Sequence, residues 1–177
     1  EPGKALLTLG TSTGIILAYP EKRKVEGACS IAEGGNLPGL WGYASGQYCA
    51  GDLLQWFVDC CVPAAYRQEA SRQGKDLHTC LSEKAAALKP GESGLLALDW
   101  WNGNRSVLAD TNLSGLLLGM TLHTSPEEIY RALMEAIAFG MRKIIESYEE
   151  AGITIGELYA CGGIAKKNPL MLQILSD

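Results

Sequence analysis

Apolar runs separated by glycine-rich breaks dominate the first fifty residues, a pattern typical of short strands. Residues 4–9 form one run, a Gly-Thr-Ser-Thr-Gly segment interrupts it, and residues 15–19 resume it. Two strand-like runs around a short glycine-bounded turn predict a β-hairpin. Residues 28–32 predict a third strand, and the glycines of residues 34–39 predict a turn.

Helical spacing begins after this region. Residues 46–61 carry apolar side chains three and four positions apart, which predicts a helix that ends before Pro63. Residues 77–88 predict a second helix, and residues 95–98 predict a short strand. Residues 66–73 are polar throughout and are left unassigned.

The clearest pattern predicts a long helix at residues 126–151. Ser125 is a suitable N-cap, a proline follows at the first helical position, and Glu128 completes a capping box. Gly152 fits the position after the helix, where glycine commonly caps the last turn. Gly140 costs a helix interior about 1 kcal/mol relative to alanine, so we expect close packing against another backbone there.

Residues 155–161 predict a last strand, and a final helix begins near Pro169. Strands grouped early and alternating with helices later predict an α/β fold with a mixed sheet. The length of 177 residues fits one domain. Because the chain starts without methionine and stops inside an apolar run, we expect a segment of a longer protein, truncated at both ends.

The charge balance and the cysteines narrow the class of protein. The chain has 15 Lys and Arg and 20 Asp and Glu, which gives a net charge of −5. This negative charge disfavours binding to nucleic acid or to an anionic membrane. No apolar run approaches the roughly 20 residues of a membrane span, and no signal peptide is visible. The 6 cysteines form no Cys-x-x-Cys pair and the 2 histidines lie far from them in sequence. That spacing argues against a zinc site and favours reduced thiols in the cytoplasm.

Two glycine-rich turns have the chemistry of ligand sites. The segment at residues 10–14 offers successive backbone N–H groups and hydroxyls, which suit an anion such as phosphate, although ordinary turns use the same residues. It is not a P-loop, because no Gly-Lys-Ser/Thr follows. Gly162 and Gly163 link a predicted strand to a helix, where backbone can approach a nucleotide. Asn168 fits either a nucleotide contact or the N-cap of the final helix.

A further polar segment follows the strand at residues 95–98. Asp99 has the chemistry of a general base, and Trp100 and Trp101 that of a sugar-stacking pair, but core packing is expected for at least one tryptophan. Asp52, in the first turns of a predicted helix, is expected to complement the helix dipole. With only two histidines available, no Ser-His-Asp set is indicated.

Four motifs in this order resemble the FGGY carbohydrate kinases, specifically their C-terminal domain and, within the family, the ribulokinase group. The motifs are Gly-Thr-Ser-Thr, Pro-Gly-x-x-Gly-Tyr-x-x-Gly-Gln-x-x-x-Gly-Asp, Leu-Asp-Trp-Trp-Asn-Gly-Asn-Arg and Gly-Gly-Ile-Ala-Lys-Lys-Asn. The resemblance covers nearly all of the chain. It implies a ribonuclease H-like (actin-like ATPase) fold and a kinase that uses ATP and Mg²⁺ to phosphorylate a ketopentose such as L-ribulose.

On this resemblance, ATP and sugar lie between two domains. Residues 1–177 are then part of the ATP-binding C-terminal domain, the N-terminal sugar-binding domain is absent, and a homodimer is left open. The residues that match the family's contacts with ATP are Gly10, Thr11, Ser12, Thr13, Gly162, Gly163 and Asn168.

The chain departs from the family pattern at two points. The family's catalytic aspartate precedes the hairpin and no residue here matches it, so we expect the segment itself to be inactive. Ribulokinases usually carry an acidic residue where this chain has Ala44, and we expect that position to face the sugar, whose identity stays open. Three alternatives also stay open. They are a non-catalytic nucleotide-binding domain of the same superfold, a carbohydrate-binding module and a structural or dimerisation domain.

Overall fold

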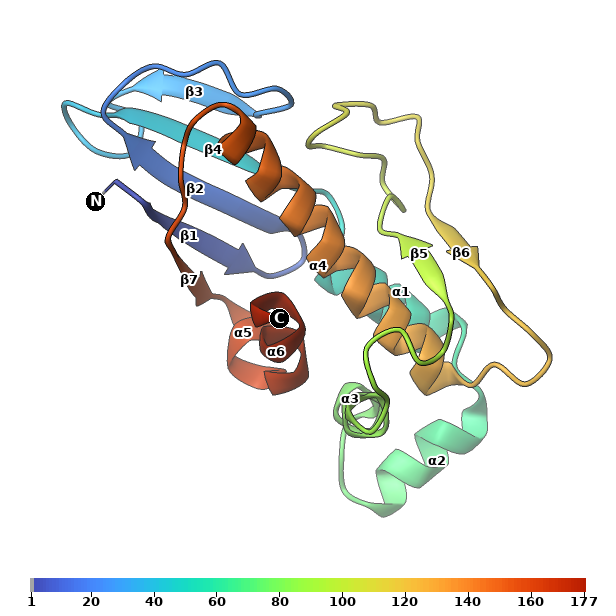
Figure 1. Cartoon of the computed structure of the whole chain (residues 1–177). Helices are drawn as coiled ribbons and strands as arrows, with labels where there is room; N and C mark the ends of the chain where they lie inside the picture. Colours follow the sequence, from blue (N-terminus) through green and yellow to red (C-terminus); the bar gives the residue numbers. More distant parts are fainter. Residues whose placement is uncertain (1) are drawn as a thin grey trace.

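A five-stranded mixed sheet forms one side of the molecule, for which a computed structural model describes residues 2–177 (Figure 1). The strand order is β3-β4-β2-β1-β7; β7 runs parallel to β1, and the other neighbouring pairs are antiparallel. The predicted hairpin is confirmed as β1 and β2. The strands are β1 Lys4–Leu9, β2 Thr13–Tyr19, β3 Ser30–Glu33, β4 Trp41–Gln47 and β7 Glu157–Cys161.

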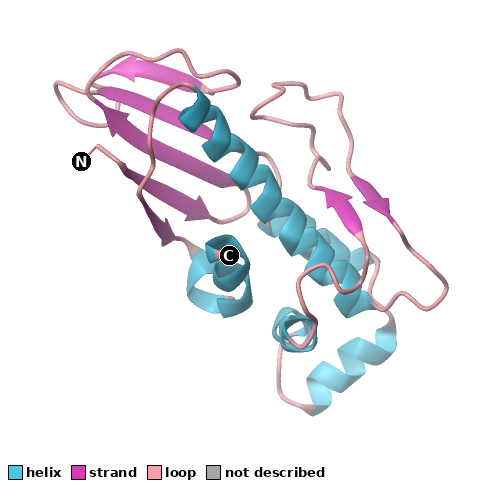
Figure 2. Cartoon of the chain, viewed as in Figure 1, coloured by secondary structure: helices cyan, strands magenta, loops and turns pink. Residues whose placement is uncertain are grey.

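The long helix α4, Pro126–Glu150, lies across one face of this sheet (Figures 1 and 2). Its predicted capping box is confirmed: the Glu128 backbone N–H donates to Ser125 Oγ at 3.4 Å, and the Ser125 N–H donates to Glu128 Oε2 at 2.6 Å. An apolar stripe along α4 packs against the sheet and the neighbouring helices. Its completely buried members, with 0% exposure, are Leu133, Ile137, Ile144 and Tyr148.

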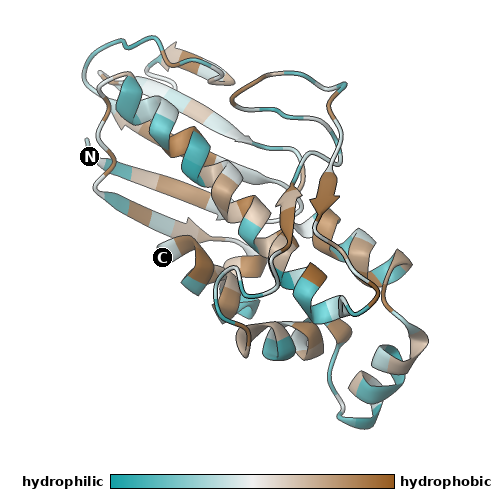
Figure 3. Cartoon of the chain, turned by 45° about the vertical axis from the view of Figure 1, so that its right-hand side comes forward, coloured by the Kyte–Doolittle hydropathy of each residue, from teal (hydrophilic) through white to brown (hydrophobic). Residues whose placement is uncertain are grey.

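Between β4 and α4 the chain forms three helices and a two-stranded sheet. They pack around the first half of α4, and Figure 3 shows that β5 and β6 are apolar along their length. Helix α2 has no apolar periodicity because Ala70 is its only buried residue, which explains why the sequence did not predict it. These elements are α1 Gly51–Cys60, α2 Ala64–Arg72, α3 Leu77–Ala86, β5 Leu96–Leu98 and β6 Leu116–Leu118.

After β7 the chain ends in two short helices, α5 Gly163–Lys167 and α6 Pro169–Ser176. The predicted start of the final helix at Pro169 is confirmed, whereas α5 was not predicted. Leu172 and Leu175 of α6 pack against the apolar cluster between α4 and the sheet. None of the helices in residues 2–177 has the length and apolarity that crossing a bilayer requires.

The helix predicted from residue 46 is wrong over its first turn, because β4 continues to Gln47 and α1 begins at Gly51. Gly46 pairs with Gly14 of β2, and a Cβ at Gly46 would overlap the carbonyl oxygen of Thr13. The glycine therefore allows close strand pairing here. Glycine in the sequence indicates a turn equally well, and this ambiguity concealed the strand.

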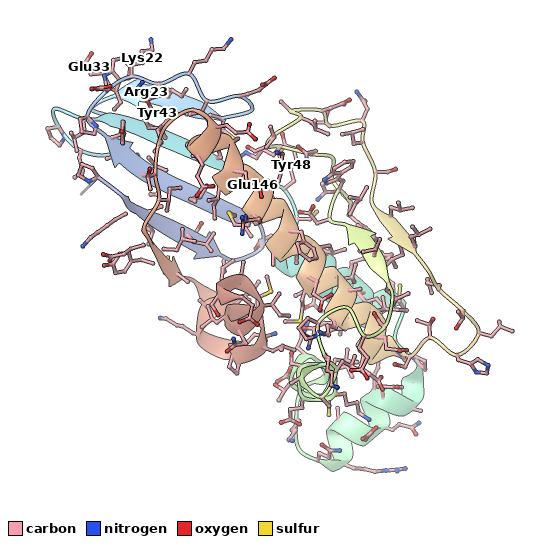
Figure 4. All side chains as sticks on the ribbon, in the orientation of Figure 1. Lys22, Arg23, Glu33, Tyr43, Tyr48 and Glu146 are labelled. Carbon is pink, nitrogen blue, oxygen red and sulfur yellow. The ribbon has the colours of Figure 1, made fainter. Side chains whose placement is uncertain are left out.

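One side chain of β4 fixes the charged connection after β2. The hydroxyl of Tyr43 donates to the carbonyl oxygen of Glu21 at 3.1 Å and accepts from the backbone N–H of Arg23 at 2.6 Å. Figure 4 shows Tyr43 beneath the connection that carries Lys22 and Arg23. The Tyr43 ring also meets Tyr148 of α4 edge-on at 6.1 Å, so one residue joins the connection, the sheet and the helix.

Candidate functional site

The turn at residues 10–12, between β1 and β2, is held from behind by the N-terminus of α1. The N–H of Gly51 donates to the carbonyl oxygen of Gly10 at 3.0 Å. The N–H groups of Ala50 and Asp52 donate to the carbonyl oxygen of Thr11 at 3.0 Å and 3.2 Å. The first N–H groups of a helix need such external partners. The carbonyl side of the turn is therefore fixed, and the opposite side is left to solvent.

The outer side of this turn carries unused donors. The side chains of Thr11 and Ser12 are exposed. Within residues 2–177 the backbone N–H groups of these two residues have no hydrogen-bond partner. Two consecutive free N–H groups flanked by hydroxyls have the chemistry of an anion-binding nest.

The second glycine turn lies directly beside the first. β7 is parallel to β1 with Cys161 opposite Thr8, so both strands end at the same edge of the sheet. At Gly162 the backbone has φ 105° and ψ 178°, and a Cβ there would overlap the backbone of Leu9. At Gly163 a Cβ would meet no atom of residues 2–177 within 4 Å. The structure thus brings the two predicted turns together, with open space at Gly163.

Thr13 faces the interior, unlike the two residues before it. Its side chain is 2% exposed, and its hydroxyl donates to Gln47 Oε1 at 2.6 Å. Gln47 Nε2 donates in turn to Asp99 Oδ2 at 2.7 Å and to the carbonyl oxygen of Ile137 at 2.9 Å. Apart from the Gly-Gln motif, nothing in the sequence around Gln47 indicates this role. Its partner Asp99 lies 52 positions away, so the contact could not be predicted from neighbouring residues.

Asp99 is a buried carboxyl group with no cationic partner among the contacts of residues 2–177. Burial raises the pKa of Asp99 from 3.8 to about 6, and its own backbone N–H and the Gln47 amide offset only part of that effect. The expected close packing at Gly140 is confirmed, but the neighbour is a side chain and not another backbone. A Cβ at Gly140 would overlap Gln47 Nε2 and lie 3.2 Å from Asp99 Oδ1.

Asn168 takes the structural role that its position allowed. Its Oδ1 accepts from the N–H of Met171 at 3.0 Å, which caps α6, and its Nδ2 donates to Ser82 Oγ at 3.0 Å. The side chain is 9% exposed. The predicted N-cap is confirmed, and a contact between Asn168 and a nucleotide stays a prediction.

The side chains of three other residues singled out in the sequence are not directed at the two turns by any hydrogen bond among residues 2–177. Ala44 is in mid-strand, paired with Ile16 and Ser30, three residues before the end of β4. Trp101 packs against Trp56 with ring centroids 5.5 Å apart, and its ring occupies the space beside Gly115. Trp101 is half-buried and packs against the core around α1 and α4, which is the contact with the core expected of one tryptophan. Asp52 is exposed in the first turn of α1.

Comparison with known proteins gives one consistent family. Residues 5–177 match the FGGY family of carbohydrate kinases, C-terminal domain. The chain is 54% identical to ribulokinase of Anoxybacillus flavithermus and 55% identical to ribulokinase of Bacillus licheniformis, over 177 residues in each case. Both matches cover 100% of this chain; they cover 31% of the first relative and 32% of the second. The chain therefore spans about a third of the length of these relatives.

Solved structures show the same likeness in three dimensions. The crystal structure of xylulose kinase from Rhodospirillum rubrum matches 100% of this chain with a TM-score of 0.84 and 24% identity, over 33% of its own length. Plasmodium falciparum glycerol kinase with ADP matches with a TM-score of 0.73 and 21% identity, over 34% of its own length. These matches confirm the expected actin-like α/β fold with a mixed sheet.

The raised pKa of Asp99 predicts a pH dependence of stability. Between its ordinary pKa of 3.8 and its folded pKa of about 6, the folded chain binds the proton more tightly than the unfolded chain. The contribution of Asp99 to the free energy of unfolding therefore decreases as the pH rises through this range, by about 3 kcal/mol.

Asp99→Asn removes this titration and keeps an acceptor for Gln47. We expect urea denaturation to show that the variant gains stability relative to wild type between pH 4 and pH 7. The exposed substitution Asp59→Asn serves as the control, and an Asp99→Asn difference independent of pH would contradict the burial argument.

Substituting alanine at the two adjacent glycines should have different effects on stability. Gly162→Ala places a side chain in a backbone region that only glycine adopts readily and against the Leu9 backbone, so it should lose at least about 1–3 kcal/mol of stability. Gly163→Ala meets open space at the start of α5 and should change stability by less than about 0.5 kcal/mol. Thermal unfolding of both variants is the measurement. Equal losses would show that the backbone of Gly162 is not constrained as described.

Proposed function

Because the chain belongs to the FGGY family of carbohydrate kinases, we propose that it supplies the ATP-binding part of a kinase that phosphorylates a ketopentose such as L-ribulose. The free N–H groups of Thr11 and Ser12 bind the phosphates of ATP, and the backbone at Gly163 lies against the adenosine. The observation that carries this proposal is that two turns 150 residues apart in the chain meet at one edge of the sheet, one with free donors and one with open space.

The chemistry of the two turns suits a nucleotide. An anion at residues 10–12 meets unpaired N–H groups and no carboxylate within the turn itself. At Gly163 a Cβ would meet no atom of residues 2–177 within 4 Å, so its backbone is open to a ligand. The glycerol kinase of similar fold is described with ADP, which supports an adenine nucleotide as the ligand.

Mg²⁺ and the catalytic base come from outside the residues assigned here. Within residues 2–177 no three His, Cys, Asp or Glu side chains are grouped to hold a metal ion. Mg²⁺ commonly keeps several waters and binds through substrate phosphates with one or two carboxylates, and it would neutralise charge on the transferred group. The role of this chain is to hold the nucleotide, while the sugar and the base belong to the remainder of the kinase.

The alternative of a carbohydrate-binding module has less support. Such a module would need both tryptophans on the surface as a stacking platform, and Trp101 is instead packed against Trp56 and Gly115. A non-catalytic nucleotide-binding domain shares the nucleotide contacts, and the ribulokinases at more than 50% identity favour the kinase.

The division of the nucleotide between the two turns is testable by calorimetric titration. Gly163→Val fills the space beside the proposed adenosine and should weaken the binding of ADP and AMP alike. Thr11→Ala keeps the backbone N–H but removes the hydroxyl, a second donor on the phosphate side. It should weaken the binding of ADP more than that of AMP, by about 0.5–1.5 kcal/mol. If each substitution had the same effect on both nucleotides, the assignment of Thr11 to phosphate and Gly163 to adenosine would be wrong.

The proposed division of labour also predicts that the 177-residue chain does not catalyse sugar phosphorylation by itself. The family's catalytic aspartate has no match here, and general acid–base assistance alone contributes about 10²–10⁴-fold. A coupled assay of ADP release with a panel of pentoses should show no increase over the sugar-free background. A full-length ribulokinase is the positive control. Sugar-dependent ADP release by the chain would place the base within residues 1–177.

A further inference from the structure

Gln47 is the most completely hydrogen-bonded side chain around the turn at residues 10–12. It is 4% exposed, and every polar atom of its amide has a partner. Asp99 and the carbonyl oxygen of Ile137 accept hydrogen bonds, so the Nε2 atom must face them and the Oε1 atom must face Thr13. The hydroxyl of Thr13 must therefore donate to Oε1, while it accepts from the Gln47 backbone N–H at 3.3 Å.

This chain of donors and acceptors reaches the end of the turn. Thr13 is the first residue of β2 and pairs with Leu9, the last residue of β1, so these two residues close the hairpin. The side chain of Thr13 is held by Gln47, and the backbone of Leu9 is held beside Gly162. Displacing the Gln47 amide therefore removes or shifts the contact that holds the side chain of Thr13, the residue that follows Ser12.

Helix α4 is built to leave room for this amide. Gly140 lies in the interior of a continuous 25-residue helix, where alanine is ordinarily more favourable than glycine. Because a Cβ at Gly140 would overlap Gln47 Nε2, alanine can be accommodated only if the amide moves away. The helix therefore has glycine instead of alanine at the position that faces Gln47.

We propose that Gln47 is a positioning residue, which keeps the turn at residues 10–12 in the shape that binds nucleotide phosphates, with Asp99 and Gly140 fixing its amide. The proposal rests on the proposed function for its ligand, and it rests on the contacts above for its mechanism. Gln47 itself is buried behind the turn and would act on bound phosphates only through Thr13 and the backbone of the turn.

The test separates positioning from ordinary stability in the full chain. Gly140→Ala displaces the amide from the helix side, and Gln47→Met removes its polar atoms at similar length. Ser45→Ala is the matched control, because it deletes another buried hydrogen bond of β4, the 2.8 Å contact with Tyr148, that does not lead to the turn. Hydrogen exchange of the Gly10, Ala50, Gly51 and Asp52 amides, whose N–H groups donate to carbonyl oxygens of the turn, is measured together with ADP and AMP affinity.

Positioning predicts a selective result. Both Gly140→Ala and Gln47→Met should speed exchange of the amides that donate to the turn and lower ADP affinity about tenfold, with AMP affected less than twofold. Ser45→Ala should lower the melting temperature without either effect. Asp99→Asn, which keeps an acceptor, should disturb the turn less than Gln47→Met.

Two outcomes would overturn the proposal. One is unchanged exchange, in Gly140→Ala and Gln47→Met, of the amides that donate to the turn, and the other is a loss of ADP affinity that AMP and Ser45→Ala share equally. If wild type binds neither nucleotide, the proposed function fails, and the exchange rates still decide whether Gln47 holds the turn.

Discussion

Parallel pairing of β1 with β7 fixes where the two glycine-rich turns lie. Parallel neighbours cannot be joined by a tight turn and need a long crossover. Here the crossover includes the 25-residue helix α4, which packs on the sheet and returns the chain beside β1. With Cys161 opposite Thr8, residues 10–12 and Gly162 follow strands that end together. The site therefore depends on the packing of a helix whose own residues lie behind it.

The rigidity of the turn at residues 10–12 comes from polar groups buried behind it. The N-terminus of α1 binds its carbonyl oxygens, and Gln47 binds Thr13 at its end. A buried amide and carboxyl group are costly unless their hydrogen bonds are satisfied. Within residues 2–177 no buried side-chain nitrogen or oxygen lacks a partner. A satisfied buried network favours one arrangement over others, because a shifted alternative would leave unpaired groups.

Local signals in the sequence were sufficient for part of this structure. The hairpin around residues 10–14 and the cap of α4 at Ser125 each depend on a few neighbouring residues, and both were predicted. The strand β4 was missed because Gly42 and Gly46 serve close approach to other segments, which a sequence does not distinguish from a turn. The contact of Gln47 with Asp99 and Gly140 joins three segments that only the folded chain brings together.

The glycines around the site are of two kinds: at most of them an added Cβ would overlap other parts of the chain, and at one it would meet open space. At Gly46, Gly51 and Gly162 an added Cβ would come too close to the backbone of the hairpin, and at Gly140 it would meet Gln47. The chain's own packing accounts for each of these four glycines. Gly163 differs, because its backbone is not in the left-handed region and a Cβ would meet no atom of residues 2–177 within 4 Å. Packing within this chain does not account for a glycine at the start of α5, whereas a ligand against its backbone would.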